Sequence, residues 1–399
     1  MNNRRTFLFG AGAVALQSSR LLGANDRLRL GIIGYGARGK ELVTYALRCP
    51  NTEFGGFADI YTDRLKESAA VAPGAKTYLD YRHLLEDRSI DAVLIATPQH
   101  LHREHFVASL AAGKHVYQEK TLAFTVEDAK KMREAHRRAP KLVVQVGHQS
   151  CSSADMVNAL ELLKTEQMGK ITEIVMHMFR NTPHDQPQWS RPVSPDMTPE
   201  KIIWNAFLGD APKRDFDPNR YQNWRFFWDY SGGNVYENMC HQLSFWYKAL
   251  NLGIPTAVNM SGGIYLWKDG REVPDTMTVA LEQPEEMLIS WTSGFGNDQL
   301  GSTEHVLGTD GTIARTANVA YLPQKITNPA GHAKPGQSTT PANMYIAHMA
   351  NFFDGIRTGS ALNCPFELGY RVAIACRMAV ESYRQRRPVR WNTATEELV

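Results

Sequence analysis

The sequence predicts an α/β protein with two domains, on three observations. In the first half, short apolar runs alternate with helical patterns, which is typical of a parallel sheet covered by helices on both faces. In the second half, apolar and polar residues alternate within several runs, which is typical of a sheet with one packed face. The length of 399 residues exceeds that of an ordinary single domain. We therefore expect a first domain over residues 25–150 and a second over residues 151–399.

A basic and apolar stretch precedes the first expected strand. Arg4 and Arg5 are followed by a mildly apolar run over residues 9–16 and then by Arg20. This order is typical of a twin-arginine export signal, and the apolar run is too short to span a bilayer. A frayed basic N-terminus is the alternative. We expect residues 1–24 to be a signal peptide, the twin-arginine export machinery to be a partner, and the protein to be periplasmic or extracellular without a membrane anchor.

The charge and the cysteine content argue against several classes of partner and site. The net charge is +3, from 44 basic and 41 acidic residues, and no basic tract stands out beyond residues 384–390. The sequence therefore gives no electrostatic case for a nucleic-acid partner. The cysteines number five and are scattered, so they predict neither a disulfide framework nor a Cys-x-x-Cys metal site.

A glycine-rich turn follows the first apolar run, residues 28–33. In a strand-turn-helix unit, Gly34 lets the chain reverse, Gly36 lets the backbone approach a pyrophosphate, and Gly39 lets the helix pack against the strand. A second apolar run ends at Asp59, where a carboxylate binds the ribose hydroxyls of an adenine dinucleotide. These features predict a dinucleotide-binding site, with NAD favoured over NADP because Asp59 would repel a 2′-phosphate.

Further strands of the first domain end in polar residues. We expect helices near residues 62–70, 103–112 and 126–138, and strands over residues 91–96, 114–118 and 142–146. Parallel sheets bind ligands at the carboxyl ends of their strands. The residues expected to hold the cofactor are Gly34, Tyr35, Gly36, Ala37, Arg38, Gly39, Asp59, Thr97, Pro98, Gln99, His102, Glu119, Lys120 and Gln149.

Three motifs carry a resemblance to a known family. Residues 96–102 (Ala-Thr-Pro-Gln-His-Leu-His), residues 111–116 (Ala-Ala-Gly-Lys-His-Val) and Glu119-Lys120 resemble the signature of the glucose-fructose oxidoreductase, inositol dehydrogenase and MocA (Gfo/Idh/MocA) superfamily. The resemblance runs from about Arg27 to the C-terminus. It implies a Rossmann domain followed by an α/β domain with a large open, mostly antiparallel sheet that often forms homo-oligomers. One departure is Thr121, where the family has a proline that commonly adopts the cis form.

Lys120 is the first candidate catalytic residue. It follows an expected buried strand at the crevice, where a lysine can hydrogen-bond the oxygen that changes charge during hydride transfer. The alternative is an ordinary solvated lysine at the end of a strand. The resemblance favours the catalytic role.

The second domain is expected to open with a helix near residues 154–166 and a strand over residues 171–179. Alternation of apolar and polar residues over 275–282 predicts a strand with one packed face. Further strands are expected at residues 287–292, 301–307 and 313–316, helices at 344–357 and 366–386, and a tail strand at 389–391. The helices should pack back on the body, and residues 328–341 should form a surface loop.

Glu237 and His241 form the second candidate catalytic group. If the chain is helical from Val235, residues four apart share one face, so Glu237 can orient His241 for proton transfer. The resemblance implies an Asp at this position and a Gly where Met239 stands, so both are departures. Two alternatives stay open: His241 is an ordinary helix histidine, or the pair binds a divalent metal with His177 or His184.

The region over residues 180–225 is rich in Trp, Asn and Arg. Aromatic faces interleaved with hydrogen-bonding groups suit a sugar, which has apolar CH faces and a rim of hydroxyls. The alternative is that the tryptophans are core and the charges solvate a long loop. The residues expected to bind substrate are Arg180, Trp204, Arg225, Tyr230 and His241.

Together these observations predict an NAD-dependent oxidoreductase that transfers hydride to or from a hydroxyl carbon of a sugar, sugar derivative or cyclitol. A free nicotinamide pool is not expected outside the cytoplasm, so an exported enzyme should hold its NAD tightly and restore its redox state in each turnover. Two other readings use the same residues. One is a glycoside hydrolase that oxidises the sugar transiently, and the other is a non-catalytic sugar-binding protein.

Overall fold

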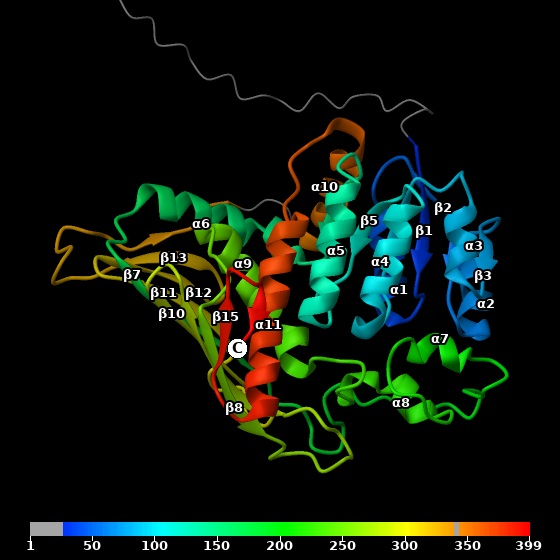
Figure 1. Cartoon of the computed structure of the whole chain (residues 1–399). Coiled ribbons are helices and arrows are strands. Elements are labelled where there is room, and N and C mark those ends of the chain that lie inside the picture. Colours follow the sequence, from blue (N-terminus) through cyan, green and yellow to red (C-terminus); the bar gives the residue numbers. More distant parts are fainter. Residues whose placement is uncertain (1–26, 339–342) are drawn as a thin grey trace, which may run out of the picture.

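The computed structural model describes residues 27–338 and 343–399 (Figure 1). The predicted export signal over residues 1–24 lies outside the described residues, as does part of the predicted loop over residues 328–341. The remaining residues form two neighbouring α/β units, each built on one sheet. None of the helices in the described ranges combines the length and the apolar character needed to cross a bilayer.

In the described part of the chain, the first domain holds a six-stranded parallel sheet in the order β3-β2-β1-β4-β5-β6. This order reverses direction beside β1, which is where doubly wound sheets bind their ligands. The strands are β1 (Leu28–Ile33), β2 (Thr52–Ala58), β3 (Lys76–Tyr78), β4 (Ala92–Ile95), β5 (His115–Gln118) and β6 (Val144–Val146). The helices are α1 (Ala37–Leu47), α2 (Thr62–Val71), α3 (Tyr81–Glu86), α4 (His102–Ala111) and α5 (Val126–Arg138).

The central strands are apolar because both faces of this sheet are covered. All four residues of β4 are buried. One face of the sheet packs on a helix from the far end of the chain, since Met349, Phe352 and Phe353 of α10 (Met344–Thr358) join the core cluster that contains Leu30 and Leu94. The prediction that the last helices pack back on the body is therefore confirmed.

The second domain holds a ten-stranded sheet within the described residues, in the order β14-β13-β12-β11-β7-β10-β9-β8-β15-β16. Only the β7–β10 pair is parallel among these strands, so the sheet is mostly antiparallel, as predicted. Its strands are β7 (Ile171–Phe179), β8 (Ala257–Gly263), β9 (Thr276–Gln283), β10 (Met287–Gly294), β11 (Ser302–Gly308), β12 (Gly311–Arg315), β13 (Val319–Pro323), β14 (Lys334–Pro335), β15 (Val389–Asn392) and β16 (Glu397–Leu398).

Helices cover one face of this large sheet. They include α6 (Ala154–Thr165), α9 (Cys240–Leu250) and α11 (Phe366–Gln385). On β9, Met277, Val279 and Leu281 are buried beneath them, while Thr278 on the other face is exposed. Helix α11 lies between the sheet and α5 of the first domain, and most of its residues are buried (Figure 1). It therefore fixes the two domains against each other.

A long connection leaves the large sheet after β7 and crosses to the first domain. It carries α7 (Trp204–Leu208) and α8 (Pro218–Gln222), which lie beside the Rossmann strands in Figure 1. The Ile203 amide donates to the Ile60 carbonyl at 3.0 Å, and the Thr62 amide donates to the Lys201 carbonyl at 3.0 Å. The connection also buries a hydrophobic cluster of mostly aromatic side chains, which comprises Tyr61, Ile202, Phe207, Leu208, Tyr221, Phe226, Phe227 and Tyr230.

The close packing of α1 on β1 gives the first testable prediction. A Cβ at Gly39 would lie 2.1 Å from the Gly34 carbonyl oxygen, a backbone atom of the turn. Gly39→Ala should therefore lower the free energy of unfolding by about 3 kcal/mol, measured by urea denaturation. The matched control is Gly36→Ala, because a Cβ at Gly36 would first meet Arg64 at an ordinary 3.5 Å, and its stability should be unchanged. Equal stabilities of the two variants would contradict this account of the turn.

Candidate active site

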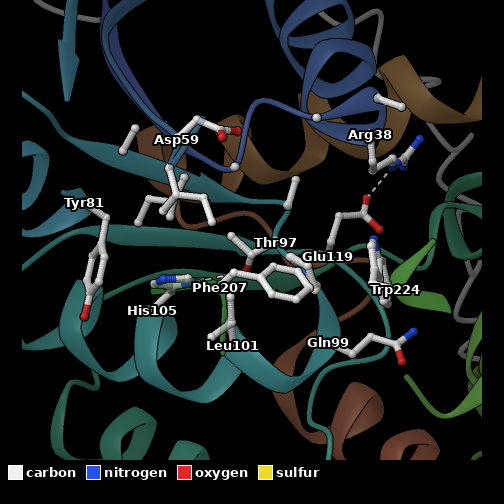
Figure 2. A pocket seen from close by; sticks show the side chains of 18 of the residues that line it. Arg38, Asp59, Tyr81, Thr97, Gln99, Leu101, His105, Glu119, Phe207 and Trp224 are labelled. Atoms are coloured by element: carbon white, nitrogen blue, oxygen red, sulfur yellow. Dashed lines mark hydrogen bonds and ion pairs between the residues drawn. The ribbon is translucent and has the colours of Figure 1, made fainter. Parts of the chain in front are cut away.

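One cavity of about 580 Å³ lies between the carboxyl ends of the Rossmann strands and the second domain. Figure 2 shows Asp59, Arg38, Glu119 and Gln99 around it, with Phe207 of α7 and Trp224 of the connecting segment on the same cavity. The predicted residues that line it are Gly34, Gly36, Ala37, Arg38, Asp59, Thr97, Pro98, Gln99, Glu119, Lys120, Gln149, Arg225, Glu237 and His241. The structure thus brings together the cofactor turn and the predicted catalytic residues.

The glycine turn provides a seat for a phosphate group. Gly34 has φ +90°, a conformation that glycine adopts without strain, and α1 begins just after Gly36. No capping side chain accepts a hydrogen bond from the amides of the first turn of α1. A side chain at Gly36 would point toward Arg64 across the cavity, so only glycine leaves this space open. Free amides at a helix N-terminus and an open backbone fit the pyrophosphate of a dinucleotide.

Asp59 occupies the position expected for a ribose-binding carboxylate. It ends β2, and its carboxylate accepts hydrogen bonds from the amides of Tyr35 at 2.7 Å and Tyr61 at 2.9 Å. The Arg64 guanidinium lies 3.7 Å from the same carboxylate. These contacts hold the carboxylate in place while it still lines the cavity, where it can accept from ribose hydroxyls. The residues present therefore fit NAD.

Three residues predicted to bind the cofactor do not line the cavity. The Tyr35 ring packs on Phe57, and Gly39 packs on the backbone of Gly34. His102 is fully buried, with its Nδ1 2.8 Å from the Thr121 carbonyl oxygen and its Nε2 3.0 Å from the Thr97 carbonyl oxygen. These residues shape the turns around the site instead of facing the ligand, because their side chains or packing surfaces are directed into the protein.

At one end of the cavity, Glu119 connects the turn to the next strand end. The Arg38 Nε donates to Glu119 Oε1 at 2.8 Å, which Figure 2 marks with a dashed line. Gln149 Nε2 lies 3.2 Å from the same oxygen and donates to the Tyr117 hydroxyl at 2.9 Å. This network fixes Glu119 and, with it, the position of the adjacent Lys120.

Lys120 and Glu237 form an ion pair between the two domains. The Lys120 Nζ lies 2.9 Å from Glu237 Oε2, and these side chains are only 13% and 9% exposed. The same oxygen lies 3.2 Å from Arg225 Nε, and Gln99 Nε2 donates to Glu237 Oε1 at 2.8 Å. The Lys120–Thr121 peptide bond is cis. Both oxygens of the carboxylate are thus occupied by donors that line the cavity.

Glu237 is held as a carboxylate by this arrangement. Burial alone would raise its pKa, but the positive charges of Arg225 and Lys120 outweigh burial and lower the pKa to about 2. Glu237 therefore stays ionised across the physiological pH range, and it directs the Lys120 ammonium group to one place on the cavity wall.

The predicted contact between Glu237 and His241 is wrong. Val235–Met239 forms a π-helical turn, and α9 starts only at Cys240, so the four-residue spacing does not place the two side chains together. Within the described residues, the His241 ring makes no hydrogen bond, and its nearest ring neighbour is His148, with centroids 5.9 Å apart. Burial and the nearby charges of Lys120 and Arg38 hold the pKa of His241 well below its ordinary value. The ring is therefore neutral at physiological pH.

Three of the residues predicted to bind substrate lie outside the cavity wall. Arg180 donates to Asn238 Oδ1 at 2.9 Å, beneath the π-helical turn. Trp204 stacks on Phe207 with ring centroids 5.0 Å apart, and Tyr230 is fully buried. The Tyr230 ring belongs to the cluster under the connection and the Trp204 ring packs against it, as the core alternative expects for the tryptophan. Among the residues predicted to bind substrate, Arg225 and His241 line the cavity.

Comparison with known proteins identifies the family. Residues 28–148 match the model described as oxidoreductase family, NAD-binding Rossmann fold. Residues 212–390 match the model described as oxidoreductase family, C-terminal alpha/beta domain. The chain belongs to the Gfo/Idh/MocA oxidoreductase family. Its first domain is the NAD-binding domain of that family, in agreement with the glycine turn and Asp59 described above.

Relatives of this Gfo/Idh/MocA chain include two curated dehydrogenases. The inositol 2-dehydrogenase of Klebsiella pneumoniae subsp. pneumoniae is 36% identical over 126 residues, which make up 30% of this chain and 36% of that protein. The myo-inositol 2-dehydrogenase of Thermotoga maritima is 27% identical over 194 residues, which make up 49% of this chain and 54% of that protein. The chain thus spans between about a third and a half of the length of these relatives.

Two solved structures show the same fold. A levoglucosan dehydrogenase in complex with NADH and levoglucosan has a TM-score of 0.69 at 21% identity, covering 91% of this chain and 99% of its own. The aldose-aldose oxidoreductase of Caulobacter crescentus complexed with glycerol has a TM-score of 0.68 at 19% identity, with coverage of 91% and 99%.

The cavity also has wall residues that were not among the predicted site residues. They are Glu41, Arg64, Tyr81, Arg82, His105, Arg191, Asn205, Phe207, Tyr221, Trp224 and Tyr345. Arg64 lies on α2, five residues after Asp59. Its place in the sequence could therefore have suggested that it lines the cofactor site. The wall residues of the connection lie in the region over residues 180–225, whose composition suggested sugar binding, but only the tertiary fold shows which of its residues reach the cavity.

The metal alternative finds no support in the described residues. There, no group of three or more His, Cys, Asp or Glu side chains gathers in a way that could hold a metal ion. His177, one of the two residues considered, lies on β7 with its Nδ1 3.1 Å from Thr303 Oγ1.

The low pKa of His241 gives a prediction on pH dependence. If His241 acts as the base that the sequence predicts, it must be unprotonated, so the rate of sugar oxidation is lost only as the pH falls through the pKa of the His241 ring in the folded protein. Because that pKa lies well below the ordinary value of 6.5, kcat/KM for oxidation should stay constant from pH 8 to pH 6. A fall centred near pH 6.5 that is absent from His241→Asn would contradict this assignment.

The inter-domain ion pair gives a prediction on stability. Glu237→Gln would leave Lys120 and Arg225 without their shared carboxylate, which should lower the free energy of unfolding by about 3 kcal/mol in urea denaturation. The matched control is Glu134→Gln, which removes an exposed partner of Arg138 and should cost less than about 1 kcal/mol. If both variants lose the same stability, the buried pair does not join the domains as described.

Proposed function

We propose that this protein is an NAD-dependent oxidoreductase that transfers hydride to or from a hydroxyl carbon of a sugar, sugar derivative or cyclitol. The observation that carries the proposal is that Lys120 and His241 line the same cavity as the glycine turn and Asp59. The relatives named above, which are inositol, levoglucosan and aldose enzymes, support the substrate class.

The two candidate catalytic side chains have complementary roles. When NAD is bound, its nicotinamide supplies the acceptor or donor of hydride. The Lys120 ammonium, fixed by Glu237, donates a hydrogen bond to the substrate oxygen. The neutral His241 ring accepts the hydroxyl proton during oxidation and returns it during reduction. Arg225 and Gln99 keep Glu237 in place, so they act as positioning residues.

The setting in which this chemistry occurs is also part of the proposal. The twin-arginine pattern supports export to the periplasm or beyond, and export of a folded protein supports a tightly bound NAD. Such an enzyme oxidises one substrate and reduces a second one, so the cofactor ends each cycle as it began. A homo-oligomer formed through the open face of the ten-stranded sheet fits this assembly, because Thr278 and Glu282 leave that face exposed.

The glycoside hydrolase reading uses the same residues but is not favoured, because the relatives named above are dehydrogenases and oxidoreductases. A non-catalytic sugar-binding protein would have no use for a buried lysine and a neutral histidine beside a nucleotide cradle.

The proposal is tested by mixing the purified protein and NAD⁺ with a panel of aldoses, ketoses, cyclitols and glycosides. Oxidation of a substrate should raise the absorbance of NADH at 340 nm. Lys120→Met should slow this step by about 10²- to 10⁴-fold, because the donor to the substrate oxygen is lost. The exposed Lys141→Met is the matched control and should retain the wild-type rate. The proposal would be contradicted if no single substrate reduced free or bound NAD and no pair of substrates gave a reduced product, or if a glycoside were hydrolysed without an acceptor.

A further inference from the structure

The second domain contributes a wall of the cavity that faces the nucleotide-binding turn. Residues 189–224, which we call the cofactor strap, line the cavity through Arg191, Asn205, Tyr221 and Trp224, among others. None of these residues was expected from the dinucleotide motif, which accounts only for the first domain.

The strap is docked next to the residue that binds the ribose. Its Ile203 and Lys201 pair through backbone hydrogen bonds with Ile60 and Thr62, immediately after Asp59. The Lys201 Nζ also lies 3.0 Å from Asp63 on α2. The strap is thus anchored at the adenosine end of the predicted cofactor site.

Aromatic packing strengthens this docking. The Arg64 guanidinium lies over the Tyr61 ring at 5.6 Å and over the Tyr221 ring at 5.1 Å from the centroid. Tyr221 belongs to the strap, whereas Arg64 and Tyr61 belong to the first domain and contact Asp59. The two domains therefore share one packed unit beside the ribose-binding carboxylate.

Arg191 is the charged residue of the strap that faces this cavity. Its backbone is held by the buried Asn223, whose Oδ1 accepts from the Arg191 amide at 2.8 Å and whose Nδ2 donates to the Arg191 carbonyl at 3.1 Å. The guanidinium itself makes no hydrogen bond or ion pair with the residues that the structure describes. A firmly held arginine with an unpaired head group is available to an anionic ligand.

The contacts of the strap place Arg191 beside the glycine turn. Asn223, which holds the Arg191 backbone, stands two residues after Tyr221, and the Tyr221 ring packs against the Arg64 guanidinium. Arg64 and Glu41 lie on the helices that begin beside Asp59 and the glycine turn. A Cβ at Gly36 would meet Arg64 at 3.5 Å, so Arg191 is held on the part of the strap that packs beside the glycine turn, and it lines the same cavity as Gly34 and Gly36.

We propose that Arg191 binds the pyrophosphate of NAD from the second domain, opposite the glycine turn, and that the docked strap thereby retains the cofactor. The inference rests on the proposed function, because it assigns a residue that holds the NAD on which that function depends. The glycine turn offers backbone amides from one side, and Arg191 offers a charge-assisted contact from the other.

The test compares Arg191→Met, Arg191→Lys and Asn223→Ala with the wild type. Exchange of bound NAD(H) for isotopically labelled NAD⁺ gives the release rate, and fluorescence titration with NADH, ADP-ribose and adenosine gives the affinities. Arg191→Met should release NAD about 10- to 100-fold faster and lose affinity for NADH and ADP-ribose but not for adenosine. Arg191→Lys should recover part of the loss, and Asn223→Ala should lie between Arg191→Met and the wild type. Arg138→Met, which removes an exposed charge on α5, is the matched control and should behave as wild type.

The outcomes separate this inference from the proposed function. If Arg191→Met binds NADH and ADP-ribose as the wild type does, the inference is overturned even where the wild type oxidises sugars. If Arg191→Met keeps its NAD and only the KM for an anionic sugar rises, Arg191 serves the substrate and the inference is likewise overturned. If the wild type binds NADH in the titration but oxidises nothing, the proposed function fails while a loss of affinity in Arg191→Met still supports the role of Arg191.

Discussion

The ion pair between Lys120 and Glu237 is the contact on which the active site depends. Lys120 stands at the end of β5 in the first domain, and Glu237 stands in the π-helical turn before α9 in the second. Each would be a costly buried charge without the other. Gln99 and Arg225 bind the same carboxylate. The Glu237 side chain therefore fixes the first domain, with its glycine turn, relative to the second domain's side of the cavity.

The packing of helices and of the connection keeps Lys120 and Glu237 in contact. Helix α11 packs between the large sheet and α5, and α10 crosses back to cover the Rossmann sheet. The connection after β7 then closes the remaining side by pairing with residues 60–62. Each domain contributes residues to the cavity. Packing against the other domain holds these residues in place, so the cavity lies between the two domains.

Local sequence patterns correctly predicted the features of the site that follow directly after a strand. The glycine turn, Asp59 and Lys120 follow buried strands directly, so their places at one edge of a parallel sheet follow from the sequence. The strand over residues 171–179 and the alternation on β9 were likewise predicted correctly, because one buried face produces a period of two.

Contacts across the domain interface could not be predicted in this way. The spacing of Glu237 and His241 suggested a pair, but the π-helical turn changes the helical period and Glu237 finds its partners in the other domain and in the connection. Composition could not tell the aromatic residues that line the cavity, such as Phe207, from those that fill the core beside it, such as Tyr230. Arg191 belongs to no motif, and the role proposed for it rests on the docking of the strap.

The central claim is that this cavity moves hydride between a sugar carbon and a retained nicotinamide. It is tested most directly by incubating the purified protein, without added NAD, with aldoses and cyclitols deuterated at carbon, and then measuring the mass of the cofactor released by acid. The account predicts a nicotinamide cofactor that carries deuterium at its ring, and loss of this label in Lys120→Met. Consumption of the sugars with deuterium in neither the cofactor nor a reduced sugar product would contradict the account.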